Sequence, residues 1–172
     1  MSGQEMPARE ELVGVSPQRA TGALHATTPL AATLGLEVLE VTAQRVQLVL
    51  PNLPGSRNHV AGPHAGAIFT AGETAAGLLA VANFGEWLDR KVGLAVRGQI
   101  EWLKLARTAV IVSAVLDVDP ADVRRLLDAG ERPQWATAIT CTRGEDEAVC
   151  ATMSVELTLV DRRPTPADVP SV

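Results

Sequence analysis

The stretch that decides the fold is RNHVAGPHAGAIFTAGETAAG, residues 57–77. From about Ala65 to Ala82 the chain is rich in Ala and Gly, and residues 58–85 contain one carboxylate, Glu73, and no Lys or Arg. A helix that is apolar nearly all round is expected to be buried nearly all round. Because a carboxylate in the middle of a membrane span is costly, the sequence predicts a buried helix of a soluble protein and no membrane partner.

Alternating apolar residues predict strands on both sides of this helix. The predicted strands cover residues 36–41, 46–50, 92–104, 110–118, 135–142 and 148–160. A short helix begins at Thr28-Pro29 and stops near Gly35, and another has Asp119 as its N-cap and Gly130 at its end. Runs of strands with segregated helices predict an α+β fold, with a curved antiparallel sheet around the central helix.

The two ends of the chain show no sustained periodicity. We expect residues 1–27 to form a flexible N-terminal arm, residues 28–161 the folded domain, and residues 162–172 a flexible C-terminal tail. A curved sheet covers only one side of the central helix, so the other side is expected to meet a second copy of the chain. The expected assembly is a homodimer, or a homotetramer built as a dimer of dimers.

Composition excludes some classes of function. A formal charge of -5 and a pI near 5.2 argue against a nucleic-acid partner or a polybasic membrane anchor. The first residues do not resemble a signal peptide, so a cytoplasmic location is expected. Cys141 and Cys150 lack metal spacing and a nearby His, which argues against zinc. The hairpin register would set them opposite each other, but two free thiols are expected in a reducing compartment.

Glu73 is the first candidate functional residue. A lone carboxylate in an apolar helix costs several kcal/mol unless it is hydrogen-bonded, paired or protonated. Burial would raise its pKa, which suits a general base near neutral pH. The structural alternative is a cap or a buried polar link.

The start of the helix is the second candidate feature. In the loop 62–66, which enters the first turn, free N–H groups point outward and the helix dipole adds partial positive charge. Such groups can stabilise the oxyanion formed at a substrate carbonyl. Asn58 can donate an amide hydrogen bond or orient a water, and His64 can hold the loop or polarise a carbonyl. Taken alone, each of these two residues is more often a satisfied loop residue than a catalyst.

Asn58, the run His64-Ala65-Gly66 and Glu73 together resemble the core motif of the hotdog-fold thioesterase superfamily, specifically its PaaI-like branch. That motif has an Asn, a His-Gly-Gly run six residues later, and an Asp or Glu nine residues after the His. The run HAGAIFTAGETAAG is closer still to a subfamily with His-Ala-Gly and Glu. The resemblance covers about residues 28–160.

The resemblance implies an acyl-CoA or acyl-carrier thioesterase without metal or redox cofactor, coenzyme A entering only with the substrate. It implies a site at each subunit interface, where the Ala65 N–H binds the thioester oxygen. Glu73 of the other subunit would act on water as a base, or as a nucleophile. Asn58 would position water or substrate, and His64 would support the loop. The implied substrate-binding residues are Gly66, Thr74 and Arg57, and Arg90 and Lys91 could also meet phosphates.

Two positions depart from the motif, and two other functions stay open. Ala65 stands where Gly is usual, which would be strained at positive φ, and Glu73 replaces the commoner Asp. A non-catalytic acyl-thioester-binding protein is one alternative. A hydroxyacyl dehydratase is the other, because His59 lies fourteen residues before Glu73. Those enzymes carry Pro-Gly-Val at the helix start, whereas this chain has Ala67-Ile68-Phe69.

Overall fold

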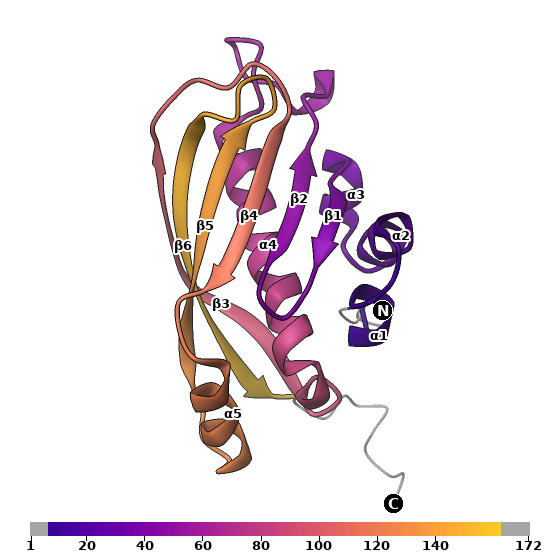
Figure 1. Cartoon of the computed structure of the whole chain (residues 1–172), viewed down its shortest axis with the longest axis vertical. Helices are drawn as coiled ribbons and strands as arrows, with labels where there is room; N and C mark the ends of the chain where they lie inside the picture. Colours follow the sequence, from indigo (N-terminus) through magenta and orange to yellow (C-terminus); the bar gives the residue numbers. More distant parts are fainter. Residues whose placement is uncertain (1–6, 163–172) are drawn as a thin grey trace, which may run out of the picture.

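The computed structural model of the protein describes residues 7–162. Its helices are α1 (Arg9–Leu12), α2 (Pro17–Thr27), α3 (Pro29–Leu34), α4 (Ala65–Phe84) and α5 (Pro120–Asp128), with short 3₁₀ turns η1 (Pro54–Ser56) and η2 (Gly85–Trp87). Its strands are β1 (Glu37–Val41), β2 (Val46–Leu50), β3 (Lys91–Trp102), β4 (Val110–Leu116), β5 (Gln134–Arg143) and β6 (Val149–Asp161). Within these residues the strands form one antiparallel sheet in the order β1-β2-β4-β5-β6-β3, which curves around α4 (Figure 1).

The predicted α+β arrangement of a curved sheet around one long helix is confirmed. The helix expected over residues 65–82 is α4, which continues to Phe84. The predicted helix starts are also correct, since Thr28 and Asp119 are the N-cap residues of α3 and α5. The Asp119 carboxylate accepts a hydrogen bond from the Ala121 N–H at 2.8 Å, which satisfies one of the free donors of the first turn.

Small residues let α4 lie close to the sheet. A Cβ atom added at Gly72 would be 2.5 Å from the Met153 sulfur on β6, so a larger residue there would force a rearrangement. Farther along the helix, the Phe84 ring meets the edge of the Trp135 ring on β5, with 4.9 Å between their centroids. The close approach buries most of α4, which is therefore a core helix although its length and composition would suit a membrane span.

The N-terminal segment differs from the sequence prediction. Residues 9–12 and 17–27 of the predicted flexible arm are the helices α1 and α2, and Leu12 and Leu24 are each 1% exposed. Apolar residues are sparse in this stretch, so its helices depend on burial against the domain and not on a strong local pattern. Residues 1–6 of the arm, and residues 163–172 of the predicted tail, lie outside the described residues.

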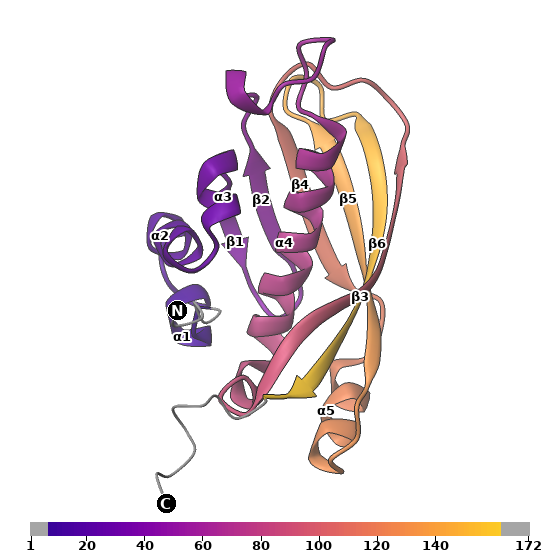
Figure 2. The same ribbon diagram turned by 180° about the vertical axis from the view of Figure 1, so that it is seen from behind.

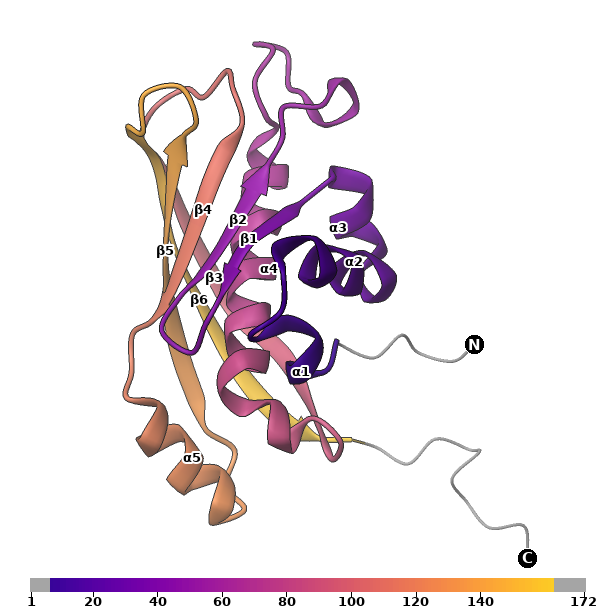
Figure 3. The ribbon, with the colours of Figure 1, turned by 45° about the vertical axis from the view of Figure 1, so that its right-hand side comes forward.

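The two edge strands of the sheet, β1 and β3, differ in whether another element covers them. Along β1, the Val38 N–H donates to Thr21 Oγ1 of α2 at 2.9 Å, and His25 Nε2 lies 2.8 Å from the Leu36 carbonyl oxygen. Helix α2 lies beside β1 (Figure 3) and supplies hydrogen bonds that another strand would otherwise make. No strand within residues 7–162 pairs with the outer edge of β3, where Leu94 and Val96 are each 46% exposed. An open apolar edge of this kind is suited to pairing with another strand.

The cysteine register differs from the prediction by one residue. Cys141 pairs with Ala151, because the β5–β6 register shifts between Cys141 and Thr142. Both thiols are free and buried, and the Cys150 thiol lies 3.4 Å from the Cys141 carbonyl oxygen. Burial raises the pKa of the Cys141 thiol to about 12, so it stays protonated and unreactive at neutral pH.

Candidate active site at the start of the central helix

Asn58 organises the loop that enters α4. Its side-chain oxygen accepts hydrogen bonds from the Val60 and Gly62 N–H groups, both at 3.1 Å. Its side-chain nitrogen lies 3.4 Å from the Pro63 carbonyl oxygen, and its own N–H donates to the Gly62 carbonyl at 2.8 Å. These contacts close residues 58–63 into a compact loop and fix the direction in which the chain enters the helix.

The loop is also held against a distant segment between β3 and β4. A Cβ atom at Gly62 would collide with the Ala106 carbonyl oxygen, so only glycine permits this approach. The Asn52 side-chain nitrogen donates to the carbonyl oxygens of Ala61 at 3.0 Å and Arg107 at 2.8 Å. The position of the helix start therefore depends on contacts between residues more than forty positions apart.

His64 caps the first turn of α4. Its Nδ1 atom accepts a hydrogen bond from the Gly66 N–H at 2.9 Å, so the ring proton of the neutral imidazole sits on Nε2. A Cβ atom at Gly66 would lie 3.2 Å from Nδ1, which explains why a residue without a side chain suits this position. The cap occupies the Gly66 N–H and leaves the Ala65 N–H as a donor without a partner in residues 7–162.

Ala65 causes no strain where the motif usually has Gly. It is the first residue of α4, and Ala61 and Glu147 are the non-glycine residues with positive φ in the described part of the chain. Because Ala65 has ordinary helical φ, its methyl group has no steric penalty there. The N–H that could bind a carbonyl oxygen is therefore available with alanine at this position.

Glu73 is one of the partly exposed residues of α4, a helix that the sheet covers on one side only (Figure 2). Its carboxylate is half-buried, and no residue from 7 to 162 forms a hydrogen bond or ion pair with it. Desolvation raises the pKa of Glu73 above its ordinary value of 4.5. Glu73 lies eight positions after Ala65, which corresponds to about 12 Å along a helix. Within one chain the carboxylate and the free N–H are thus too far apart to act on one carbonyl group.

Two residues that the sequence analysis did not single out share the face of Glu73. Phe69 and Thr70 lie one turn before it and are partly exposed. The Thr70 hydroxyl donates to the Gly66 carbonyl at 3.0 Å. Phe69 packs on the open-edge strand β3, where a Cβ at Gly98 would be 2.6 Å from its ring. The helical spacing relative to Glu73 could have identified both residues.

The other predicted substrate-binding residues are spread over the fold. Thr74 is 8% exposed, so its hydroxyl faces the core and not the open side of α4. Arg57 is exposed beside the helix start, and its Nε donates to Asn52 Oδ1 at 3.1 Å. Arg90 and Lys91 lie beyond the opposite end of α4, where Lys91 forms a 2.7 Å ion pair with Asp161. Arg57 alone of these cations is near Ala65.

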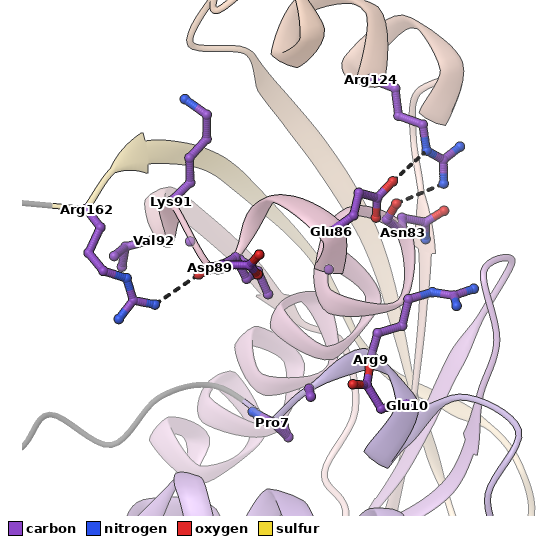
Figure 4. Close-up of a pocket in the computed structure, with 14 residues that line it drawn as sticks. Pro7, Arg9, Glu10, Asn83, Glu86, Asp89, Lys91, Val92, Arg124 and Arg162 are labelled. Carbon is purple, nitrogen blue, oxygen red and sulfur yellow. Dashed lines mark hydrogen bonds and ion pairs between the residues drawn. The ribbon is translucent and has the colours of Figure 1, made fainter.

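The opposite end of α4 borders a hollow of about 880 Å³ (Figure 4). Arg9 Nε donates to the Ala82 carbonyl at 2.9 Å and Arg124 Nη2 to the Asn83 carbonyl at 2.8 Å, which satisfies the end of the helix. Arg124 also lies 3.6 Å from Glu86. Because Arg9 and Arg124 are used in these hydrogen bonds and this ion pair, we assign the hollow no catalytic role. In residues 7–162 no three His, Cys, Asp or Glu side chains are grouped to hold a metal ion.

Solved structures with a similar fold include several named as thioesterases. A Pseudomonas aeruginosa protein described as a probable thioesterase is 22% identical, with 88% of this chain and 99% of that chain covered and a TM-score of 0.71. A thioesterase from Haemophilus influenzae is 13% identical, covering 86% and 92%, with a TM-score of 0.66. A thioesterase family protein from Silicibacter pomeroyi is 20% identical, covering 83% and 96%, with a TM-score of 0.64.

These similarities confirm the hotdog fold that the sequence motif implied. No curated protein matches the sequence at a significant level. Residues 18–159 match the family described as "Domain of unknown function (DUF4442)", which spans α2 to β6 and includes the whole helix-start motif. The chain therefore belongs to the DUF4442 family, with a hotdog domain built around α4.

Proposed function

We propose that the protein hydrolyses acyl thioesters at a site shared between two copies of the chain. The observation that carries this proposal is the half-buried Glu73 carboxylate, which has no partner in residues 7–162 and has a raised pKa. Perturbed carboxylates of this kind favour a functional role. The free Ala65 N–H at the helix start supplies the complementary group for a carbonyl oxygen.

The proposed reaction uses these two groups in sequence. The Glu73 carboxylate accepts a proton from water as the water oxygen bonds to the thioester carbonyl carbon. The carbonyl oxygen gains negative charge and is stabilised by the Ala65 N–H. The carbon–sulfur bond then breaks, the carbonyl re-forms, and the departing thiolate takes the proton from Glu73. Direct attack by the carboxylate, through an anhydride that water cleaves, is a second route open to the same groups.

A second copy of the chain is needed to complete such a site. Ala65 and Glu73 are about 12 Å apart along one helix, so one carbonyl cannot contact both. An antiparallel partner helix would bring the Glu73 of one copy toward the Ala65 of the other. The uncovered edge of β3 and the open side of α4 support a homodimer of this form. A dimer of dimers remains our expectation for any larger assembly.

The loop residues have supporting roles in this proposal. The hydrogen bonds of Asn58 support a positioning role for the loop that carries the oxyanion donor. The cap formed by His64 supports a similar role at the first turn. The names of similar solved structures favour thioester chemistry, and acyl-CoA is the substrate class we propose. Such a substrate would be consistent with action in the cytoplasm.

The test is thiol release from short, long and aromatic acyl-CoAs by the wild type and by Glu73→Ala. We expect wild-type turnover that falls at least about a hundredfold in the variant, the scale of losing a general base. Glu131→Ala removes an exposed carboxylate just after α5, which lies at the opposite end of the fold from the start of α4 (Figure 1), and serves as the matched control. Saturable acyl-CoA binding without thiol release by wild type would instead indicate an acyl-thioester-binding protein and refute the catalytic assignment.

A further inference from the structure

Three cations near the start of α4 have no carboxylate partner. Arg57 lies in the loop before the helix, and Lys104 and Arg107 lie in the connection between β3 and β4. Across residues 7–162, none of the three is within 4.0 Å of a carboxylate oxygen. Six other cations in this part of the chain do form ion pairs. Other arginines without ion pairs, such as Arg19 and Arg132, lie elsewhere in the fold, so what distinguishes this end is that two such cations lie on adjoining segments, an arrangement suited to an anion.

The two arginines are held on adjoining backbone segments. Asn52 links them, because its side-chain oxygen accepts from Arg57 Nε at 3.1 Å and its side-chain nitrogen donates to the Arg107 carbonyl at 2.8 Å. The close approach of Gly62 to the 106–107 backbone fixes the same junction. The Arg107 side chain is exposed and forms no hydrogen bond or ion pair with the described residues, so its guanidinium is available to a ligand.

Nearby carboxylates do not neutralise this pair. Asp146 is hydrogen-bonded to Arg143 Nε at 2.9 Å, and Glu145 lies 3.7 Å from the same nitrogen. These two acids of the turn between β5 and β6 are therefore paired with Arg143. Lys104 is close enough to contribute to the lowered pKa of Asp146, so it is less available than the arginines. Residues 103–109 contain no acid, and Glu101, near the end of β3, is exposed.

An apolar surface lies on the same connection. Trp102 is 54% exposed, and Leu103 and Leu105 are 52% and 45% exposed. An exposed indole on the segment that leads to Arg107 can stack on a nucleotide base, and a guanidinium can make charge-assisted hydrogen bonds to its phosphate. Lysine would lack that forked geometry.

We propose that Arg57 and Arg107 bind the 3′-phosphorylated nucleotide end of coenzyme A, with the adenine on the Trp102–Leu105 surface and Asn52 as a positioning residue. This inference rests on the proposed thioesterase function. A pantetheine arm separates the thioester from the phosphates, so their site belongs beyond the helix start, where these segments lie (Figure 1). Two arginines with acidic residues on the neighbouring β5–β6 turn favour a small polyanion over the broad acidic surface of a carrier protein.

The experiment measures binding and turnover separately. The affinities of coenzyme A, dephospho-coenzyme A and 3′,5′-ADP are measured by calorimetry for wild type, Arg107→Gln and Arg57→Gln. Arg125→Gln, at an exposed guanidinium on α5, is the matched control. We expect each test variant to bind coenzyme A at least about tenfold more weakly, the loss of one charge-assisted hydrogen bond. The control is expected to bind like wild type, and dephospho-coenzyme A to bind wild type less tightly.

Turnover gives the second readout. The ratio of kcat/KM for an acyl-CoA to kcat/KM for the same acyl group on pantetheine should fall in Arg107→Gln and in Asn52→Ala, and stay unchanged in Arg125→Gln. Equal coenzyme A affinity in all proteins would overturn the phosphate site. The phosphate site would also be overturned if the arginine variants bound coenzyme A normally but bound a phosphopantetheinyl carrier protein more weakly. That result would assign the arginines to the carrier protein.

The two proposals can fail independently. Arginine-dependent coenzyme A binding without thiol release would leave the phosphate site standing and refute hydrolysis. Thiol release with the same kcat/KM for acyl-CoA and acyl-pantetheine in wild type would support hydrolysis and refute the phosphate site. Thermal melting of Arg57→Gln checks that loss of its contact with Asn52 has not unfolded the loop, and Arg107→Gln, which breaks no such contact, tests the site without that complication.

Discussion

The Nδ1 atom of His64 lies 2.9 Å from the backbone nitrogen of Gly66 and accepts its hydrogen bond. This contact makes the histidine an N-cap, a role usually filled by Ser, Thr, Asp or Asn. The Gly66 N–H is thereby satisfied within the loop. The Ala65 N–H next to it has no hydrogen-bond partner in residues 7–162.

Replacing His64 separates its capping role from any direct role in catalysis. His64→Ala should lower the free energy of unfolding by about 1 kcal/mol, because the Gly66 N–H loses its acceptor. His64→Asn should restore most of that loss, since Asn is a strong N-cap residue. Urea denaturation of the three proteins measures the effect. If His64→Asn recovers stability and kcat/KM together, the imidazole acts only through the loop; recovered stability with low kcat/KM would mean that its Nε2–H contacts substrate.

Glu73 should make folding less stable as the pH rises. Desolvation raises its pKa above 4.5 in the folded protein. Below pH 4.5 the Glu73 carboxyl is protonated in both the folded and the unfolded protein, so its burial takes nothing from the free energy of unfolding through ionisation. Between 4.5 and the folded pKa the folded state binds more protons than the unfolded state, and stability is lost. Glu73→Gln should therefore be more stable than wild type at pH 8 and equally stable near pH 4.

The same substitution should remove activity while the protein stays folded. We expect Glu73→Gln to lose at least about a hundredfold in kcat. In wild type, kcat/KM should rise with pH as the Glu73 carboxyl loses its proton, with an apparent pKa above 4.5. Denaturation at the two pH values and a pH–rate profile provide the data. A stability difference that is as large at pH 4 as at pH 8 would contradict the assigned titration.

Two glycines should tolerate an added methyl group very differently. At Gly62 the Cβ would strike the backbone carbonyl of Ala106, which cannot move without displacing the loop. At Gly72 it would meet the flexible side chain of Met153. We expect Gly72→Ala to cost about 1–3 kcal/mol, the usual range for overpacking, and Gly62→Ala to cost more.

Measured unfolding free energies rank the two variants, and kcat/KM adds a second comparison. Gly62→Ala should also reduce activity, because it moves the residues that carry the Ala65 donor. The double variant Gly72→Ala/Met153→Ala should be more stable than the sum of its single effects predicts. An additive result would show that the Met153 side chain is not the obstacle at Gly72.

The open edge of β3 should control assembly. Val96 is 46% exposed at the bulge of this strand, and Val115 is 43% exposed on the outer face of β4. A lysine at position 96 would place a charge where a second copy is proposed to pair. Val96→Lys should therefore give a folded monomer with little activity, whereas Val115→Lys should remain a dimer. Light scattering with circular dichroism measures both properties, and a dimeric Val96→Lys protein would place the interface elsewhere.

Local pattern was sufficient to predict most of the elements. The run of small apolar residues around Glu73 predicted α4, and Thr28 and Asp119 predicted two helix starts that the structure confirms. Pairing of the late strands was less accurate, because the bulge after Cys141 moved the register by one residue. A bulge adds one residue to one strand, and the few residues between it and the β5–β6 turn carry too little alternation for periodicity to locate it.

The sequence by itself determined the long apolar helix, its burial, and the isolation of Glu73 as its one carboxylate, since these properties depend on residues close together in the chain. Only the tertiary structure decided which edge of the sheet stays open, that α2 covers the other, and that Ala65 has ordinary helical φ. Contacts such as Thr21 with Val38 and Gly62 with Ala106 determine those features. The two residues of each pair meet only when the chain has folded. The sequence around one of them does not indicate which residue it will contact.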